Sequence, residues 1–449
     1  MADLLGESTE LLRQLIRNSC VNDGTPESGY ESVSAGMLAS YLEGPGIDLE
    51  TYEPLPGRAS LVARIEGREP AHPSLLLMGH TDVVPANPDN WLRDPFGGEL
   101  VDGEVWGRGA VDMLCLTASM AVTVRRLADQ GFRPAGTLIY LAVADEEAGG
   151  RLGAEWLIRN RPDAVRCDYC ITESGGFPLP LSANGGPKLP VTVAEKGVYW
   201  CTVRVRGRPG HGSRPFRGDN ALVKAAEIVR RLAEYRPRTR VPDVWRRFVE
   251  GMELPADAAA SLLDPSRIED TCASHPDPGW ARLVHASTHT SIAPTVLRSG
   301  IKTNVIPDRA ELQVDIRTLP GQGEDEVRTM LAEALGDLHD AVEVVVDAHD
   351  PATASPLETP LWETLRRATA GLVPGAGMVP FLATGSSDAR FFRSLGATSY
   401  GFGLFSERLG FDGYAAMIHG DNERVDQASL GLCAELWPAV ARDLLQSPG

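Results

Sequence analysis

The stretch SLLLMGHTD, residues 74–82, decides the fold that this sequence predicts. Its short apolar run is typical of a strand, and the run ends in two polar residues, His80 and Asp82. In an open α/β sheet, ligands bind beyond the carboxyl ends of the strands. We therefore expect His80 and Asp82 to lie at a binding edge.

Two later stretches end in the same way. TLIYLAVADEE, residues 137–147, is an apolar run that closes on Glu146 and Glu147, and CDYCITE, residues 167–173, closes on Glu173. Parallel strands place their carboxyl ends at the same edge of a sheet. The three glutamates should therefore meet the histidine of the first strand.

A long amphipathic helix is predicted over residues 113–131, between the first two of these strands. Strands that alternate with helices imply βαβ units, so the predicted fold class is α/β, with a mostly parallel sheet flanked by helices. Asp112 stands at the start of this helix, where the helix dipole favours a carboxylate.

Five carboxylates and a histidine would then share one cleft. Ionised groups of like sign repel one another and are not buried without compensation. The sequence places no run of Lys or Arg beside them, so divalent cations are the natural counter-charge. Two dications balance three carboxylates and one bridging hydroxide, and imidazole and carboxylate are suitable ligands for zinc.

The pattern changes near residue 195. GVYWCTVRVRG, residues 197–207, alternates with period two, as a half-exposed antiparallel strand does, and further strands and helices follow it. We predict a discontinuous α/β domain formed by residues 1–194 and 352–449. An inserted α+β domain, residues 195–351, would interrupt it.

Composition restricts the partners and the compartment. The chain has 449 residues, a formal charge of -18 and a pI near 5.0, which argue against nucleic acid or an anionic membrane as a partner. The N-terminus lacks the features of a secretory signal, and no apolar run reaches the roughly 20 residues of a membrane span. Seven cysteines, scattered and odd in number, favour reduced thiols. These features predict a cytoplasmic protein.

Over nearly its whole length the sequence resembles a known enzyme family. This is the di-zinc metallopeptidase family of aminoacylase, carboxypeptidase G, succinyl-diaminopimelate desuccinylase, acetylornithine deacetylase and bacterial dipeptidases. The resemblance implies a zinc-exopeptidase-like catalytic domain with an inserted lid or dimerisation domain. The motifs that carry it are, in family order, LLLMGHTDVVPA (75–86), NWLRDPFGGELVDGEVWGRGAVDM (90–113), ADEEAGG (144–150), GHGSRP (210–215), KTNVIPDRAELQVDIRTLPG (302–321), TGSSDARFF (384–392) and HGDNERV (419–425).

The resemblance implies two divalent metal ions per subunit, zinc in the first place, with cobalt or manganese as alternatives. His80, Asp112 and Glu173 would bind one ion. Asp112, Glu147 and His419 would bind the other, so that Asp112 is shared.

The resemblance also implies how the reaction proceeds. Glu146 would be the general base that takes the proton from the metal-bridging water and delivers it to the leaving nitrogen. Asp82 would accept the second N–H of His80 and fix its tautomer. The peptide bond after Asp112 is often cis in this family.

Two residues of the inserted domain are implied as substrate contacts near the reacting carbonyl. In relatives that dimerise through this domain, the residue that matches His211 reaches into the partner's cleft and stabilises the oxyanion. Asn304 resembles a second oxyanion or substrate contact. A homodimer through the inserted domain is therefore expected.

Other residues are implied as contacts to the rest of the substrate. Arg317 matches an arginine that pairs with the substrate carboxylate, although an ion pair with Asp315 or Glu311 is the alternative interpretation. The hydroxyls of Ser386 and Ser387 are candidates for further substrate contacts.

The implied function is hydrolysis of an amide or peptide bond in an N-acyl amino acid or dipeptide with a free carboxylate. A carbamoyl-amide (ureido) substrate, or an N-succinyl or N-acetyl deacylase, is the alternative. A non-enzymatic metal-binding scaffold is not favoured, because every expected position is filled. His285 and His289 have the i,i+4 spacing of some zinc helices, but the β-forming residues around them predict ordinary structural roles.

Overall fold

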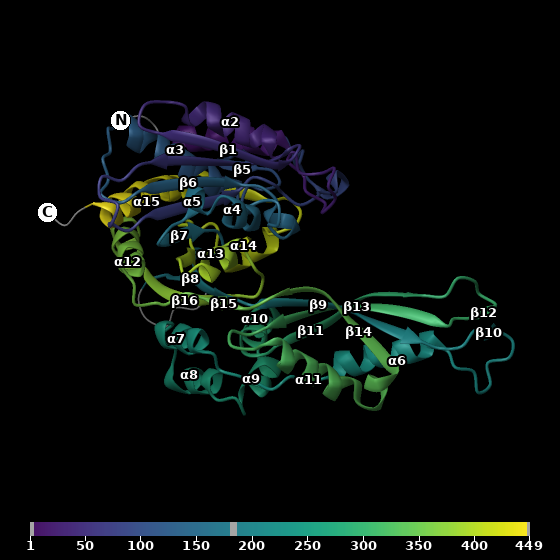
Figure 1. Ribbon diagram of the computed structural model, residues 1–449. Helices are drawn as coiled ribbons and strands as arrows, with labels where there is room; N and C mark the ends of the chain where they lie inside the picture. The colour runs from purple at the N-terminus through teal and green to yellow at the C-terminus, as the bar shows by residue number, and fades with distance from the viewer. Residues whose placement is uncertain (1–3, 180–185, 447–449) are drawn as a thin grey trace.

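The protein is described by a computed structural model that covers residues 4–179 and 186–446. Its main sheet has the strand order β1-β2-β6-β3-β7-β17-β8-β15, with β16 beside β8. The inner pairs β3–β6, β3–β7 and β7–β17, and the β16–β8 pair, are parallel. The predicted class, a mostly parallel sheet flanked by helices, is confirmed (Figure 1).

The strands of this sheet come from both ends of the chain. Six of them precede the inserted lid domain in the sequence, and three follow it. Their bounds are β1 Asp48–Leu55, β2 Arg58–Ile65, β3 Leu75–His80, β6 Leu138–Val143, β7 Tyr169–Thr172, β8 Lys188–Glu195, β15 Thr353–Ala354, β16 Gly377–Ala383 and β17 Thr398–Gly401.

Helices cover both faces of the sheet. One face is covered by α1, α2, α3, α12 and α15, whose apolar residues form the largest core cluster. The other face is covered by α4, α5 and α13, which share a second cluster with β3 and β6. The helix bounds are α1 Leu4–Asn18, α2 Ser32–Leu42, α3 Leu114–Asp129, α4 Ala154–Asn160, α5 Pro162–Val165, α12 Pro360–Leu372, α13 Ala389–Ser394, α14 Phe411–Met417 and α15 Gln427–Leu445.

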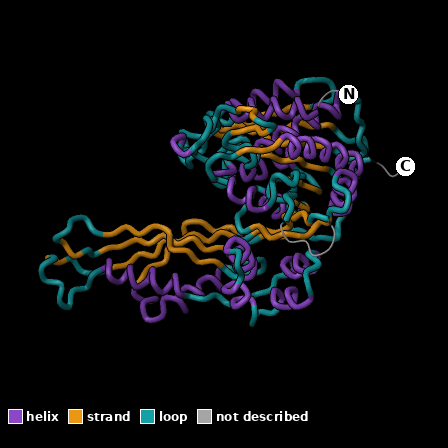
Figure 2. Tube along the Cα trace, turned by 180° about the vertical axis from the view of Figure 1, so that it is seen from behind, coloured by secondary structure: helices purple, strands orange, loops and turns teal. Residues whose placement is uncertain are grey.

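The inserted lid has a separate antiparallel sheet, in the order β11-β13-β9-β14. Buried and exposed side chains alternate along much of β9, as the period of two in its sequence predicts. One face of this sheet is therefore buried under two helices. Figures 1 and 2 show the lid as a long arm that extends away from the main sheet. Its elements are β9 Gly197–Arg206, β11 Ser291–Ser299, β13 Arg309–Thr318, β14 Val342–Asp350, α6 Ala221–Glu234 and α11 Glu324–Leu335.

Four helices occupy a polar, proline-rich segment in which the sequence pattern assigns no individual elements. They are α7 Asp243–Gly251, α8 Ala256–Leu263, α9 Ile268–Ser274 and α10 Pro278–Thr288. α7 packs against β16, and its buried Trp245 and Phe248 join the core of the main sheet rather than that of the lid. The β-forming residues around His285 were misleading, because α10 continues through that residue to Thr288.

Two small sheets complete the fold. One consists of β4 Glu99–Val101, β5 Glu104–Trp106 and β18 Arg424–Asp426, and the other of β10 Gly210–His211 and β12 Val305–Ile306. Within residues 4–179 and 186–446, no helix is long and apolar enough to cross a membrane.

Candidate metal centre

The polar ends of three central strands lie at one edge of the main sheet. β3 ends at His80, β6 is followed by a turn that carries Glu146 and Glu147, and β7 is followed directly by Glu173. β3 pairs in parallel with both β6 and β7, so these ends are neighbours. The structure therefore brings together side chains that are far apart in the sequence.

His80 lies at the middle of this group, and its side chain is buried. Its Nε2 atom is 3.2 Å from Asp112 Oδ1 and 3.8 Å from Glu173 Oε2. Its Nδ1 atom donates to the backbone carbonyl of Asp82 at 2.9 Å. Since a carbonyl can only accept, Nδ1 carries a proton and Nε2 faces the carboxylates, as in histidines that bind metals.

His419 reaches this group from the loop after α14. Its Nε2 atom is 3.0 Å from Glu147 Oε2 and 3.4 Å from Asp112 Oδ2. Asp112 thus turns one oxygen toward His80 and the other toward His419. Its peptide bond to Met113 is cis, as the resemblance implies. A carboxylate whose two oxygens face separate donors is suited to sharing between two cations.

The donor atoms are spaced closely enough to hold cations. In two groups, His80 with Glu146 and Glu173, and His80 with Asp112 and Glu147, each residue offers one ligand atom within 4.8 Å of those of the others. Imidazole nitrogen and carboxylate oxygen suit zinc and related divalent transition metals. The donor set therefore fits a metal.

Burial and crowding shift the pKa values of these groups. Burial, followed by the charge of Asp112, raises the pKa of the Glu173 carboxyl to about 8. Burial, followed by the charge of Glu173, raises the pKa of Glu146 well above its usual value. Hydrogen bonds to Asp112 and Glu147 raise the pKa of His419 to about 10. The crowded carboxylates therefore favour the binding of positive charge, which divalent cations would supply.

Asp82 has a different contact from the one the resemblance implies. Its carboxylate Oδ1 is 3.7 Å from His80 Nδ1, beyond hydrogen-bond distance, and the backbone carbonyl of Asp82 accepts that N–H instead. The Asp82 carboxylate accepts from the backbone N–H groups of Glu147 at 3.1 Å and Glu146 at 3.3 Å. Asp82 therefore connects the histidine at the end of β3 to the turn after β6.

A buried ion-pair network, which the sequence did not reveal, supports the same turn. Arg58 donates to Glu31 at 2.7 Å and to Asp145 at 2.7 Å, and all three side chains are buried. Asp145, with a φ of 71°, precedes the two glutamates in a left-handed conformation. Asn22 adds a bond of 2.8 Å to Asp82. Asn22, Glu31 and Arg58 lie outside every motif, so no sequence signal pointed to them.

Glu423 holds the loop that carries Asp112. Its Oε1 atom accepts from the backbone N–H groups of Val111 at 2.7 Å and Asp112 at 2.9 Å. Its Oε2 atom accepts from the N–H of Gly109 and from the Arg108 guanidinium, both at 2.9 Å. Glu423 is wholly buried, so these four bonds fix the position of the loop. The one available signal was its place four residues after His419 in HGDNERV.

Replacing Glu423 with glutamine should loosen this loop. One oxygen becomes an amide NH₂ that faces other donors, so two bonds to a charged acceptor are lost, each of about 1.5–3 kcal/mol. We expect the free energy of unfolding to fall by about 3 kcal/mol and metal affinity to fall about 10–100-fold. Denaturant unfolding and metal titration measure the two effects.

The matched control is Glu104→Gln. Glu104 pairs with Arg424 at 3.2 Å on the neighbouring β5–β18 ladder, but both side chains are about one-third exposed. Such a pair contributes about 0–1 kcal/mol, so this variant should behave like the wild type. Equal losses in the Glu104 and Glu423 variants would contradict the role given to Glu423.

The predicted lid residues near the reacting carbonyl lie at the tip of the arm. His211 ends β10, which pairs with β12, and Figures 1 and 2 both show these strands far from the main sheet. The His211 side chain is exposed, and its Nδ1 atom is 2.7 Å from the Ser213 hydroxyl. Asn304 is exposed in the adjoining turn. One chain by itself therefore does not bring His211 and Asn304 to the metal centre.

The other predicted substrate contacts have partners within the chain. Arg317 forms an ion pair with Asp315 at 2.8 Å, which is the alternative that the sequence left open. Ser387 is buried and donates to Glu195 at 2.5 Å, so its hydroxyl is directed at the root of the lid. Ser386 is half-buried in the same loop.

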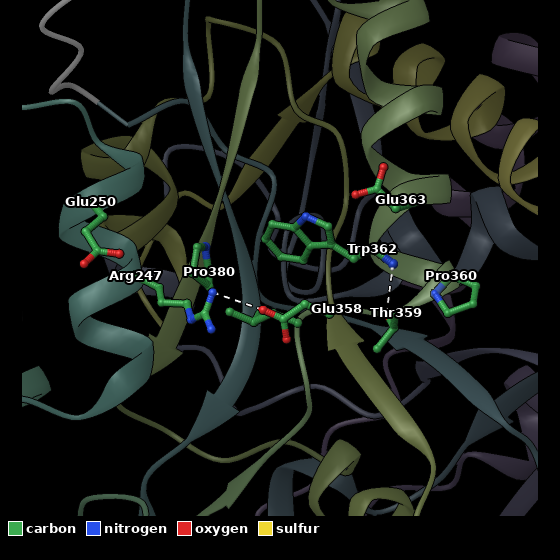
Figure 3. A pocket seen from close by; sticks show the side chains of 9 residues that line it. Arg247, Glu250, Glu358, Thr359, Pro360, Trp362, Glu363 and Pro380 are labelled. Atoms are coloured by element: carbon green, nitrogen blue, oxygen red, sulfur yellow. Dashed lines mark hydrogen bonds and ion pairs between the residues drawn. The ribbon is translucent and has the colours of Figure 1, made fainter.

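A cavity of about 640 Å³ lies away from this group, between α7 and the start of α12. Arg247 and Glu358 form an ion pair of 3.1 Å across it, and Trp362 lines one side (Figure 3). Its lining holds none of the residues predicted from the sequence, and no histidine or cysteine. This cavity therefore contributes no residue to the candidate metal centre.

Comparison with known proteins identifies the family. Residues 76–443 match the model of peptidase family M20/M25/M40. The chain is 27% identical to aminoacylase-1 of Sus scrofa over 429 residues, which cover 94% of this chain and 91% of that protein.

Solved structures share the fold. The M20 family metallo-carboxypeptidase Sso-CP2 of Sulfolobus solfataricus matches with a TM-score of 0.72 at 16% identity, over 98% of this chain and 99% of that one. The YXEP protein of Bacillus subtilis, described as a dinuclear metal-binding peptidase of the M20 family, matches with a TM-score of 0.58 at 15% identity, over 98% of each chain. The chain thus belongs to peptidase family M20/M25/M40 and is a metallohydrolase of amide or peptide bonds.

Proposed function

We propose that this enzyme hydrolyses the amide or peptide bond of an N-acyl amino acid or dipeptide that carries a free carboxylate. The observation that carries this proposal is the approach of His80 and His419 to opposite oxygens of Asp112. The similarity of this chain to an aminoacylase over nearly its whole length supports an acylated amino acid as the substrate class.

Two divalent ions, zinc in the first place, would be held by this group. His80, Asp112 and Glu173 would form one set of ligands, and Asp112, Glu147 and His419 the other. When bound, such ions lower the pKa of water and polarise a carbonyl group. The buried loop and turn contacts described above would keep the ligands in position before the ions arrive.

Glu146 is proposed as the general base. Its carboxyl group lies with His80 and Glu173 in one cluster, but it is not needed in either proposed ligand set. Glu146 would take a proton from the attacking water at its carboxylate oxygen and deliver it to the leaving nitrogen. A carboxyl whose pKa is raised by burial holds that proton more readily than an exposed one does.

Arg317 is proposed to bind the substrate carboxylate. Its guanidinium already binds Asp315 through two nitrogens, at 2.8 and 3.3 Å, which is the geometry in which arginine recognises carboxylates. The substrate carboxylate would replace Asp315 as the partner. Trp200, whose ring lies 5.7 Å below the guanidinium, would keep it oriented during this exchange.

His211 and Asn304 are proposed to act in the cleft of a second copy of the chain. They are exposed on the arm, away from the metal centre of their own chain, and in a dimer they would reach the centre of the partner. Large exposed apolar side chains of the lid support a protein contact, namely Phe216, Leu222, Val223, Leu297 and Ile301, which are 41–94% exposed. The homodimer through the lid thus stays our proposal.

Mixing two inactive variants tests the shared site. His211→Ala and Glu146→Gln should each turn over substrate at least about 100-fold more slowly than the wild type, because each lacks one catalytic group. A heterodimer of the two holds one cleft with both groups intact, so refolding the variants together should restore up to about a quarter of the wild-type activity. A mixture as inactive as its components would exclude a site that is shared across subunits.

A substrate panel tests the proposed function. N-acetyl amino acids and dipeptides should be hydrolysed faster than N-succinyl or N-carbamoyl amino acids. Amidating the carboxylate of the best substrate should raise KM strongly, since Arg317 would lose its charged partner. Preference for the N-carbamoyl compounds would instead make the enzyme a ureido hydrolase.

A further inference from the structure

A second cluster of metal-binding side chains lies outside the metal centre. Glu269 is on α9, His285 is on α10, and His289 directly follows α10. The Oε1 atom of Glu269 is 3.4 Å from His289 Nε2 and 3.5 Å from His285 Nε2, and all three donor atoms lie within 4.8 Å of one another. None of these residues has a part in the proposed hydrolysis.

The two separations from Glu269 match those around a zinc ion. Zinc–nitrogen bonds of about 2.0–2.1 Å and zinc–oxygen bonds of about 2.0–2.2 Å, arranged as a tetrahedron, place neighbouring ligand atoms about 3.3–3.5 Å apart. The two measured distances from Glu269 to the histidines are 3.4 and 3.5 Å. Two imidazoles and one carboxylate also form a familiar three-residue zinc set, whose fourth position is open to water.

His289 is arranged as a metal-binding histidine. Its side chain is wholly buried, and its Nδ1 atom donates to the backbone carbonyl of His285 at 3.0 Å. This bond fixes the proton on Nδ1 and leaves Nε2 to face Glu269. The same arrangement, with Nδ1 bound to a carbonyl and Nε2 directed at a carboxylate, is found at His80 in the metal centre.

Two contacts would change when an ion binds. The Thr239 hydroxyl lies 2.8 Å from His289 Nε2 and would give up that hydrogen bond. The rings of His285 and His289 are stacked 4.0 Å apart, so the His285 ring must turn its edge toward the shared glutamate. The His285 and Glu269 side chains are 38% and 46% exposed, which leaves both free to adjust around the buried His289.

The cluster lies at the root of the lid. Lys196, between β8 of the main sheet and β9 of the lid, is buried and donates to the carbonyls of Ala286 at 2.9 Å and His289 at 2.8 Å. It also donates to the hydroxyl of Ser291, the first residue of lid strand β11, at 2.7 Å. An ion held by His285 and His289 would therefore brace the segment from which the lid extends.

We propose that Glu269, His285 and His289 form an additional divalent-cation site, selective for zinc-like ions, which stabilises the root of the lid. This site is independent of the proposed hydrolysis, because it shares no residue with the metal centre. It predicts one more bound equivalent of zinc per chain than the metal centre holds.

Metal binding to the full chain tests the proposal. Zinc bound per chain at equilibrium dialysis should fall by one equivalent in Glu269→Gln and in His285→Ala. Both side chains are partly exposed, so these variants should stay folded. The matched controls are Asp270→Asn, next to Glu269 on α9, and His275→Ala, at the end of the same helix; both should bind as much zinc as the wild type.

An Asp112→Ala background separates this site from the metal centre. Removing the shared ligand should eliminate the two ions of the centre but leave one equivalent, and adding Glu269→Gln should eliminate that one as well. Zinc should also raise the thermal midpoint of Asp112→Ala but not that of the double variant. If Asp112→Ala binds no zinc, or binds the same amount with and without Glu269, the cluster is a hydrogen-bonded group and the proposal is wrong.

Discussion

Replacing Glu146 with glutamine should lower kcat about 10²–10⁴-fold, the contribution expected of a general base. Glutamine has nearly the same shape but cannot accept a proton at neutral pH, so the loss should appear in kcat rather than in KM. The backbone N–H of Glu146 would still bind Asp82, which preserves the turn. Steady-state kinetics on the best substrate of the panel measures the effect.

Metal content distinguishes loss of the base from loss of the centre. Because Glu146 is outside the proposed ligand sets, the Glu146→Gln variant should keep the zinc content of the wild type. Glu155→Gln is a suitable control, since Glu155 lies on α4 in an ion pair with Arg159. Glu146→Gln with normal kcat would remove this residue as the base, and Glu146→Gln without metal would make it a ligand.

Replacing Asp112 with alanine should abolish turnover by removing both ions of the metal centre. Asp112 is the residue that faces both histidines, at 3.2 Å and 3.4 Å, so its carboxylate belongs to both proposed ligand sets. Metal analysis should show the loss of two equivalents. The expected fall in activity exceeds that of Glu146→Gln, because water activation and carbonyl polarisation are lost together.

Thermal unfolding gives an independent measure of the same loss. A ligand that binds only the folded state stabilises it by about 2.7 kcal/mol when present at 100 times its dissociation constant. Chelation should therefore lower the thermal midpoint of the wild type markedly more than that of Asp112→Ala. Asp89→Ala, a change on an exposed 3-10 turn, should respond as the wild type does. Equal responses of the wild type and Asp112→Ala to chelation would mean that Asp112 does not hold metal.

The central strands of the main sheet and the position of the candidate site could be predicted from the sequence. Apolar runs that end in His80, Glu147 and Glu173 are each local signals, and strand pairing between β3, β6 and β7 then brings these ends together. The carboxyl ends of parallel strands all lie at the same edge of the sheet, so the sequence pattern strongly constrains where these side chains lie. The predicted α/β class and the antiparallel lid are confirmed, because both were predicted from local patterns of apolar residues.

The helices α7 to α10 were not predicted, because their stability comes from tertiary packing. Pro242, Pro255 and Pro278 interrupt the segment, and its apolar residues are spread over short helices. Trp245 and Phe248 become core residues only when α7 lies on β16. Short helices are marginal by themselves, so local periodicity is weak where such packing supplies the stability.

The sequence by itself determined which residue types stand at the strand ends, and its motifs predicted the family, the sheet and a metal-binding edge. Only the tertiary structure decided how those residues are held: Glu423 binds the Asp112 loop, Arg58 and Glu31 support the glutamate turn, and the carbonyl of Asp82, not its carboxylate, orients His80. The reason is physical. Periodicity and strand ends are properties of neighbouring residues, whereas a buried carboxylate finds its donors wherever the folded chain leaves N–H groups that water cannot reach.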